Sequence, residues 1–155
     1  MLHTTFIHAL AKALALVTLC LLGLAFTTKA GLDGYEIYLN DQLILKQYVN
    51  QPLDLRKLQL EKADPNDQLR IYYTHCHIDG AGTGRSIAVK DQKGRILKQW
   101  EFMDVADSRT SAVMVIPVKE LLQLEKSHVH HDLTLHYTAK ELFEGETFLA
   151  SFRLD

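Results

Sequence analysis

The most regular alternation of hydrophobic and polar residues in the chain lies between Gln68 and Asp79. A period of two, built from β-branched and aromatic residues, predicts a β-strand. One side of this strand carries Leu69, Ile71, Tyr73, His75 and His77. That side begins apolar and ends in two imidazoles, and a glycine-rich loop at 80–84 follows. We therefore expect the strand to leave the core before His75, so that both histidines lie at the rim. Burial would instead require a metal ion or a hydrogen-bond network around the two rings.

Alternating stretches joined by turn residues predict two β-hairpins. They join residues 35–39 to 43–49, and residues 86–90 to 95–102. In the last of these stretches Ile96, Trp100 and Phe102 share one face, which we expect to lie in the core. Further strands are predicted at 112–116, 133–138 and 147–154. Residues 53–60 fit either a bulged strand or a short helical turn, because their leucines change phase.

The pattern changes to helical spacing after Pro117. Proline suits the first position of a helix, where its missing N–H would be unpaired in any case. The spacing predicts one helix of two to three turns near 117–127. Short strands with turn signals about every ten residues and a single short helix are typical of one architecture. We expect a mostly β fold, a two-sheet antiparallel β-sandwich of immunoglobulin-like or jelly-roll-like type.

The first thirty residues follow the three-part plan of a secretory signal peptide. Lys12 and the amino terminus supply the positive charge, residues 13–26 are apolar and uncharged, and small residues precede the expected cleavage after Ala30. The apolar run is 14 residues long, short of the roughly 20 that span a bilayer. We expect 1–30 to be removed and 31–155 to form a single domain, exported to the periplasm, the cell surface or the medium. A retained anchor and lipidation at Cys20 are the alternatives.

The charge of the expected mature domain restricts its partners. Two of the 17 basic residues, Lys12 and Lys29, lie in the leader, so 15 remain against 19 acidic residues and the formal charge is −4. Nucleic acids and anionic membranes are bound through basic surfaces, so both classes of partner are disfavoured. Cys76 is the only cysteine left after cleavage, which excludes an internal disulfide and favours a small buried side chain over a reactive thiol.

Two histidine groups are the candidate metal ligands. His75 and His77 lie two apart on one predicted strand, so both rings project from the same face, as Zn or Cu ligands require. The second group is His128, His130 and His131. If the two groups met at one end of the sandwich, they would supply enough ligands for a closed site. The alternative is a pair of rim histidines and a polar junction between helix and strand.

The sequence shows no catalytic constellation. Cys76 is flanked by His75 and His77, but neighbouring residues of a strand point to opposite faces, so neither histidine easily activates the thiol. The motifs Gly-x-Ser-x-Gly and His-Glu-x-x-His are absent, and a strand rather than a helix is predicted after the glycine-rich loop, which disfavours a phosphate-binding loop. Tyr38 and Tyr72 lie on the faces opposite the leucines of their strands, as a glycan- or peptide-binding surface requires, although cross-strand tyrosine pairs also simply stabilise sheets.

Most of the mature chain resembles a family of small exported bacterial proteins without an assigned function. The similarity lies in the runs GYEIYLNDQLILKQYVN, QLRIYYTHCHIDGAGTGRSIAVKDQKGRILKQW and PVKELLQLEKSHVHHDLTLHYTAKEL. The resemblance implies export and a sandwich fold, and it implies no catalytic or binding residue.

These observations favour an exported, non-enzymatic envelope module that binds a protein or a glycan. The rival hypothesis is a periplasmic protein that handles Zn or Cu through the two histidine groups. A hydrolase is less favoured than either. After removal of the leader we expect no contact with the membrane and no bound cofactor unless the metal hypothesis holds.

Overall fold

The computed structural model of the chain describes residues 32–49, 57–60, 62–78, 80–104, 112–129 and 131–153. All of these belong to the unit formed by residues 31–155. The expected leader and its cleavage site at Ala30 lie outside the described residues. No helix in the described part of the chain is long and apolar enough to cross a membrane.

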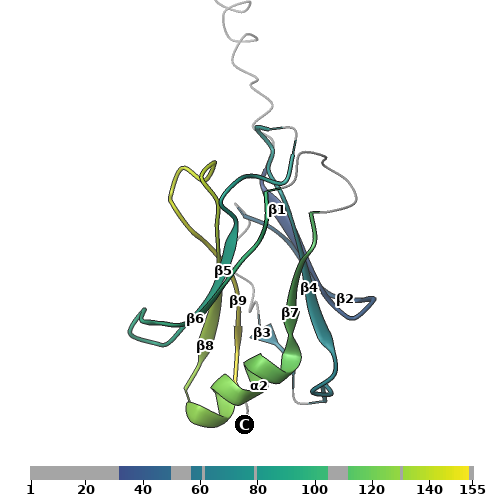
Figure 1. Cartoon of the computed structure of the whole chain (residues 1–155), viewed down its shortest axis with the longest axis vertical. Coiled ribbons are helices and arrows are strands. Elements are labelled where there is room, and N and C mark those ends of the chain that lie inside the picture. Colours follow the sequence, from purple (N-terminus) through teal and green to yellow (C-terminus); the bar gives the residue numbers. More distant parts are fainter. Residues whose placement is uncertain are drawn as a thin grey trace, which may run out of the picture. The chain divides into compact units, whose positions relative to one another are not determined.

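Two β-sheets pack face to face, as the sequence predicted (Figure 1). The first sheet has the order β2-β1-β4-β7 and the second has the order β3-β9-β8-β5-β6. The strands are β1 (Gly34–Leu39), β2 (Gln42–Tyr48), β3 (Lys57–Leu58), β4 (Gln68–Thr74), β5 (Ser86–Lys90), β6 (Ile96–Glu101), β7 (Met114–Pro117), β8 (Leu133–Thr138) and β9 (Thr147–Phe152). All pairings are antiparallel except that of β3 with β9, which is parallel. The mostly β, two-sheet sandwich is confirmed.

The helix α2 (Val118–Ser127), the only helix among the described residues, follows β7 directly. Pro117 occupies the position before the helix rather than its first turn, because it is extended (φ −64°, ψ 124°) and still pairs with Gln68 of β4. Glu120 lies in the first turn and Lys126 in the last, the arrangement that the helix dipole favours. The inner face of α2 buries Val118 and Leu121 over the open end of the sandwich.

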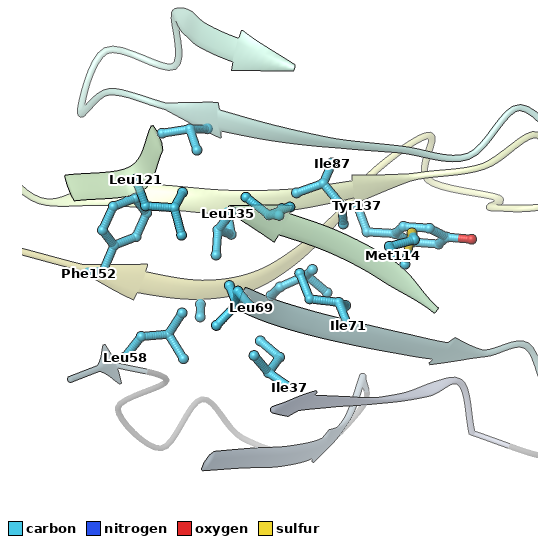
Figure 2. Packing of buried hydrophobic residues seen from close by; sticks show 14 of the residues in the cluster. Ile37, Leu58, Leu69, Ile71, Ile87, Met114, Leu121, Leu135, Tyr137 and Phe152 are labelled. Carbon is cyan, nitrogen blue, oxygen red and sulfur yellow. The ribbon is translucent and has the colours of Figure 1, made fainter. Parts of the chain in front are cut away.

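The inward-facing residues of both sheets form one core (Figure 2). Ile37, Leu69 and Ile71 of the first sheet face Ile87 and Leu135 of the second, and none of these side chains is exposed. Each fully buried aliphatic side chain of this size contributes roughly 1.5–3 kcal/mol to the free energy of unfolding. The period of two read from the sequence placed Leu69 and Ile71 on this inner face.

A β-bulge makes one expectation about the core wrong. Strand β6 was expected to bury Ile96, but this side chain is 56 % exposed. The register shifts between Val89 and Lys90 of the partner strand, so Ile96 pairs with outward-facing Lys90 and Leu97 packs against the core instead. Trp100 and Phe102 do pack against the core, but each is only partly buried, because β6 is an edge strand.

A second bulge changes the face of a residue in β9. Alternation in the strand predicted at 147–154 places Phe148, Ala150, Phe152 and Leu154 on one face, and Leu154 lies outside the described residues. The register shifts between Leu135 and His136 of β8, so Phe148 pairs with outward-facing His136, and Leu149 is buried in its place. Ala150 and Phe152 are buried, as expected. The extra residue at the bulge places Phe148, on its N-terminal side, on the opposite face from Ala150 and Phe152, and no local sequence signal marked it.

Candidate binding site at one end of the sandwich

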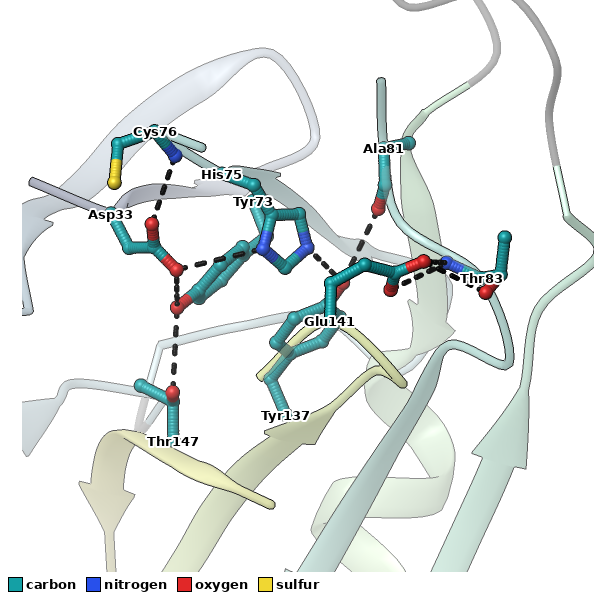
Figure 3. Close-up of polar contacts among 9 residues, drawn as sticks. All are labelled: Asp33, Tyr73, His75, Cys76, Ala81, Thr83, Tyr137, Glu141 and Thr147. Atoms are coloured by element: carbon teal, nitrogen blue, oxygen red, sulfur yellow. Dashed lines mark hydrogen bonds and ion pairs between the residues drawn. The ribbon is translucent and has the colours of Figure 1, made fainter. Parts of the chain in front are cut away.

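The two ends of the sandwich differ in chemistry. We call the end where β4 and β8 finish at Thr74 and Thr138 the His75 end, and the end covered by α2 the helix end. Strand β4 starts at the helix end, where Gln68 pairs with Pro117, and β8 starts there at Leu133. Both strands run to the His75 end, where polar and aromatic side chains replace the aliphatic core (Figure 3).

His75 is buried in a hydrogen-bond network, so its expected rim position is wrong. The side chain is 6 % exposed, Nδ1 lies 3.5 Å from Asp33 Oδ2, and Nε2 lies 3.1 Å from the hydroxyl of Tyr137. In a neutral ring with its proton on Nδ1, the Nδ1–H group points towards the Asp33 carboxylate. The unprotonated Nε2 then accepts a hydrogen bond from the Tyr137 hydroxyl. Alternation continued to bury this position after β4 ended at Thr74. His77, two residues later, is exposed as expected.

Asp33 joins three segments of the chain through its carboxylate. Oδ1 accepts the backbone N–H of Cys76 at 2.9 Å, and Oδ2 accepts the hydroxyl of Tyr73 at 3.0 Å. The Tyr73 oxygen also lies 3.3 Å from Thr147 Oγ1 at the start of β9. The carboxylate therefore couples the residue before β1 to the end of β4 and, through Tyr73, to the opposite sheet.

Aromatic rings fill the space beneath this network. The ring of Tyr73 stacks on that of Tyr137 from the opposite sheet, with centroids 4.2 Å apart, and the His75 ring lies 4.8 Å from Tyr73. Tyr35 on the neighbouring strand β1 lies parallel to Tyr73, with centroids 6.4 Å apart, and its hydroxyl donates to the carbonyl of Leu149. Stacked rings with satisfied hydroxyls allow a polar layer to close the core without unpaired groups.

The glycine-rich loop is held against the network rather than free. The backbone N–H and the hydroxyl of Thr83 both donate to the Glu141 carboxylate, at 2.8–3.0 Å. The hydroxyl oxygen of Tyr137 also lies 3.3 Å from the carbonyl oxygen of Ala81, which competes with His75 Nε2 for the single hydroxyl proton. Gly82 has φ +82°, and a Cβ there would lie 2.7 Å from His75 Nε2. Glycine is therefore required for two reasons, the positive φ and the close approach of the imidazole.

Burial and hydrogen bonding fix the charges of these groups. Burial lowers the pKa of His75 below its ordinary value of 6.5, although the nearby Asp33 and Glu141 charges oppose this shift. Burial raises the pKa of Asp33, but the hydrogen bonds from Cys76 and Tyr73 outweigh it, so this pKa is lowered. Burial likewise acts against the Thr83 hydrogen bonds at Glu141, and the pKa of Glu141 is also lowered. At neutral pH the imidazole is therefore neutral and both carboxylates are charged.

The thiol of Cys76 is held in its protonated form. Burial and its hydrogen bond to Asp33 both raise the pKa of Cys76 above its ordinary value. A nucleophilic cysteine needs the opposite shift, since the thiolate is the reactive form. The cysteine is free and partly buried, which agrees with the expectation of a small packed side chain. The arrangement supports a structural role for the Asp33–His75 pair rather than activation of a nucleophile.

An exposed apolar surface lies above the network. Phe143 is 92 % exposed, the edge of its ring meets His77 with centroids 6.0 Å apart, and Ile78 is 38 % exposed. Two pockets of about 220 and 240 Å³ flank Phe143 and share Asp33, His77 and Leu142 as lining residues. We call the surface formed by His77, Ile78, Leu142 and Phe143 the Phe143 surface.

The structure does not bring the two histidine groups together. His75 lies at the His75 end, whereas His128 caps α2 through a contact of 2.9 Å between Nδ1 and the carbonyl of Leu124, and His131 follows at the helix end. Strand β8 runs five residue steps from Leu133 to Thr138 and separates the two ends by about 17 Å, at 3.3 Å per residue. His130 lies outside the described residues. Among the residues described, no group of three or more His, Cys, Asp or Glu side chains is placed to hold a metal ion, and metal binding stays a prediction.

The structure does bring Tyr38 and Tyr72 together. Their rings lie on the outer face of the first sheet, with centroids 5.5 Å apart and planes at 78°. They border a pocket of about 250 Å³ that also contains Glu36 and Arg70. The Tyr38 hydroxyl donates to Glu36 at 2.8 Å, and the Arg70 guanidinium pairs with Asp41 at 2.7 Å. The edge-to-face geometry presents no common flat face for a sugar ring.

Sequence reasoning missed most members of the network. Asp33 precedes the first predicted strand, Tyr137 lies within the strand predicted at 133–138 and Glu141 follows that strand, and none of them was predicted as a site residue. The available signal was the phase of β4: Tyr73 and His75 continue the buried side of Leu69, and a buried imidazole needs polar partners. The identity of those partners depends on β1, β8 and the turn after β8, which are distant in sequence.

No family model, no curated protein and no solved structure matches the chain. The role of the site is therefore inferred from its geometry alone. The resemblance to small exported bacterial proteins stays a prediction.

Proposed function

We propose that the mature domain is an exported, non-enzymatic envelope module that binds a protein partner through the Phe143 surface. The observation that carries this proposal is the exposure of Phe143 between two pockets at a rigidly hydrogen-bonded end of the sandwich. An exposed aromatic side chain of this kind is typical of an interface hot spot. Burying this side chain against a partner would remove its apolar surface from water and so contribute favourably to the free energy of binding.

The size of the pockets favours a protein segment over a small-molecule substrate. Sites for small molecules are commonly about 300–1,000 Å³, whereas the two pockets beside Phe143 measure about 220 and 240 Å³. Each accommodates a side chain. The neutral, buried His75 and the protonated Cys76 support the non-enzymatic part of the proposal.

A selection of random peptides displayed on phage tests this function. Peptides selected on the mature wild-type domain are measured against Phe143→Ala, and we expect their affinity to fall by roughly tenfold or more, as at an interface hot spot. Ile96→Ala is the matched control, because Ile96 is also exposed but lies on β6, away from the Phe143 surface. If the selected peptides bind Phe143→Ala as tightly as wild type, the Phe143 surface is not their binding site.

Glycan binding at Tyr38 and Tyr72 is the second candidate function. The observation that favours it is the pocket in which both rings meet carboxylate and guanidinium groups on the outer sheet face. A glycan array probed with wild type and Tyr72→Ala tests it. Binding of a glycan that Tyr72→Ala abolishes and Phe143→Ala leaves intact would replace the protein-binding proposal.

A further inference from the structure

The carboxylates beside the Phe143 surface have no lysine or arginine partner among the described residues. Elsewhere, many carboxylates have a basic partner: Glu36 with Lys46, Asp41 with Arg70, Asp91 with Arg95, Glu120 with Lys98, Asp132 with Arg153 and Glu146 with Lys90. Asp33, Glu141 and Glu144 line the two pockets beside Phe143, and no lysine or arginine lines either pocket. The negative charge of this end is therefore not neutralised within the described residues.

The donors that satisfy two of these carboxylates are neutral. Asp33 accepts a backbone N–H and a tyrosine hydroxyl, and Glu141 accepts the N–H and hydroxyl of Thr83. His75, the only imidazole that contacts Asp33 among the described residues, is neutral near pH 7 because burial lowers its pKa. Hydrogen bonds from neutral groups stabilise a carboxylate but leave its charge in place, so both remain available to attract a cation.

Two basic side chains near this end, Arg85 and Lys140, do not compensate these charges. Arg85 is buried, and its guanidinium donates to the carbonyls of Met103 and Ala112 at 2.7 and 2.9 Å. The chain of Lys140 passes over Gly84, beyond the pocket linings. Neither forms an ion pair with any carboxylate of the described residues. The Phe143 surface thus combines an exposed aromatic ring with uncompensated negative charge.

We infer that the segment bound at the Phe143 surface carries an apolar side chain next to arginine or lysine. This inference rests on the proposed function and names the chemistry of its partner. The apolar side chain enters a pocket beside Phe143, and the basic group meets Glu144, which is exposed and has no ion pair in the described chain. An exposed pair of this kind contributes roughly 0.2–1 kcal/mol and weakens with salt, so it sets partner choice more than total affinity.

Three labelled twelve-residue peptides test the inference by fluorescence anisotropy. The first carries phenylalanine between two arginines in a glycine–serine background, the second replaces both arginines with glutamate, and the third replaces phenylalanine with serine. We expect the first to bind wild type most tightly and to weaken between 50 and 300 mM NaCl. Glu144→Gln should weaken it by about two- to fivefold, whereas Asp132→Asn, an equal charge change at the helix end, should leave binding unchanged.

The outcomes separate failure of the inference from failure of the proposed function. Equal binding of the arginine and glutamate peptides, with both lost in Phe143→Ala, would overturn the inferred partner chemistry and keep the docking surface. If no selected or designed peptide shows binding that depends on Phe143, both the inferred partner chemistry and the proposed function are overturned. Concentration-dependent self-association that Phe143→Ala abolishes would identify a second copy of this chain as the occupant and would likewise overturn the inference.

Discussion

At the scale of single residues, the fit of the glycine-rich loop against His75 depends on Gly82. We expect Gly82→Ala to destabilise the domain well beyond Gly94→Ala. Both glycines have positive φ, +82° and +76°, but a Cβ at Gly94 meets nothing within 4 Å, whereas one at Gly82 would lie 2.7 Å from His75 Nε2. The left-handed conformation alone costs roughly 1–2 kcal/mol, and overpacking adds roughly 1–3 kcal/mol at Gly82. Urea unfolding of both variants measures the difference. Equal losses in the free energy of unfolding would show that the loop can move away from the His75 ring without cost.

The two histidines of the 75–77 segment should differ sharply in their contribution to stability. His75→Ala removes a buried ring and leaves the Tyr137 hydroxyl and the Asp33 carboxylate short of a partner. We expect the free energy of unfolding to fall by roughly 2–4 kcal/mol. His77→Ala removes an exposed side chain and should change it by less than about 0.5 kcal/mol. Chemical denaturation measures both variants, and a small effect at His75 would restore the rim interpretation.

The imidazoles of buried His75 and partly buried His136 also predict how stability depends on pH. Burial lowers the folded-state pKa of both His75 and His136 below the ordinary value of 6.5. The unfolded chain therefore binds more protons than the folded domain as the pH falls below about 6.5, so the free energy of unfolding decreases from there towards the folded-state pKa values. Above about 6.5 this contribution is fully present. Urea unfolding at pH 7.5, 6.5 and 5.5 measures the decrease, and His136→Gln should reduce its slope; a constant free energy across this range would contradict the prediction.

At the scale of elements, the side chain of Trp100 connects the edge strand β6 to the helix α2 through a hydrogen bond. Trp100 Nε1 donates to Glu120 Oε2 at 3.1 Å, and the Lys98 ammonium lies 3.1 Å from the same oxygen and 5.8 Å from the centre of the Trp100 ring. Because the indole is only partly buried, we expect Trp100→Ala to cost less than Phe152→Ala, which empties a fully buried site for roughly 3–5 kcal/mol. Comparison of the two urea midpoints decides this. If both variants lose the same free energy of unfolding, Trp100 contributes to the core as much as a fully buried residue.

The elements themselves follow from local patterning, with two exceptions. The hairpins β1–β2 and β5–β6, the helix after Pro117 and the strand β8 all lie where period and turn residues predicted them. The bulges opposite Val89 and Leu135 moved Ile96 and Phe148 to outer faces. A bulge is selected by pairing between strands and by sheet twist, so the sequence of one strand does not reveal it.

At the scale of the whole molecule, the site requires an N-terminus that keeps Asp33. Its carboxylate organises the His75 network, and its carbonyl accepts the N–H of Val49 at 2.8 Å. We expect the exported protein to begin at Gly31, which retains Asp33, and a recombinant form that begins at Gly34 to melt at lower temperature. N-terminal sequencing of the exported form and thermal unfolding measure the two. A leader retained in the membrane fraction would contradict the first expectation.

The sequence by itself determined the two-sheet architecture, because alternation, turn residues and the change to helical spacing are properties of neighbouring positions. It also marked Tyr73 and His75 as members of the buried side of their strand. Only the tertiary structure decided what surrounds His75, because Asp33, Tyr137 and Glu141 come from segments that meet through strand pairing rather than through proximity in the chain. It also decided that Phe143 is exposed beside carboxylates that have no lysine or arginine partner among the described residues, since exposure and charge compensation depend on which side chains the fold brings together.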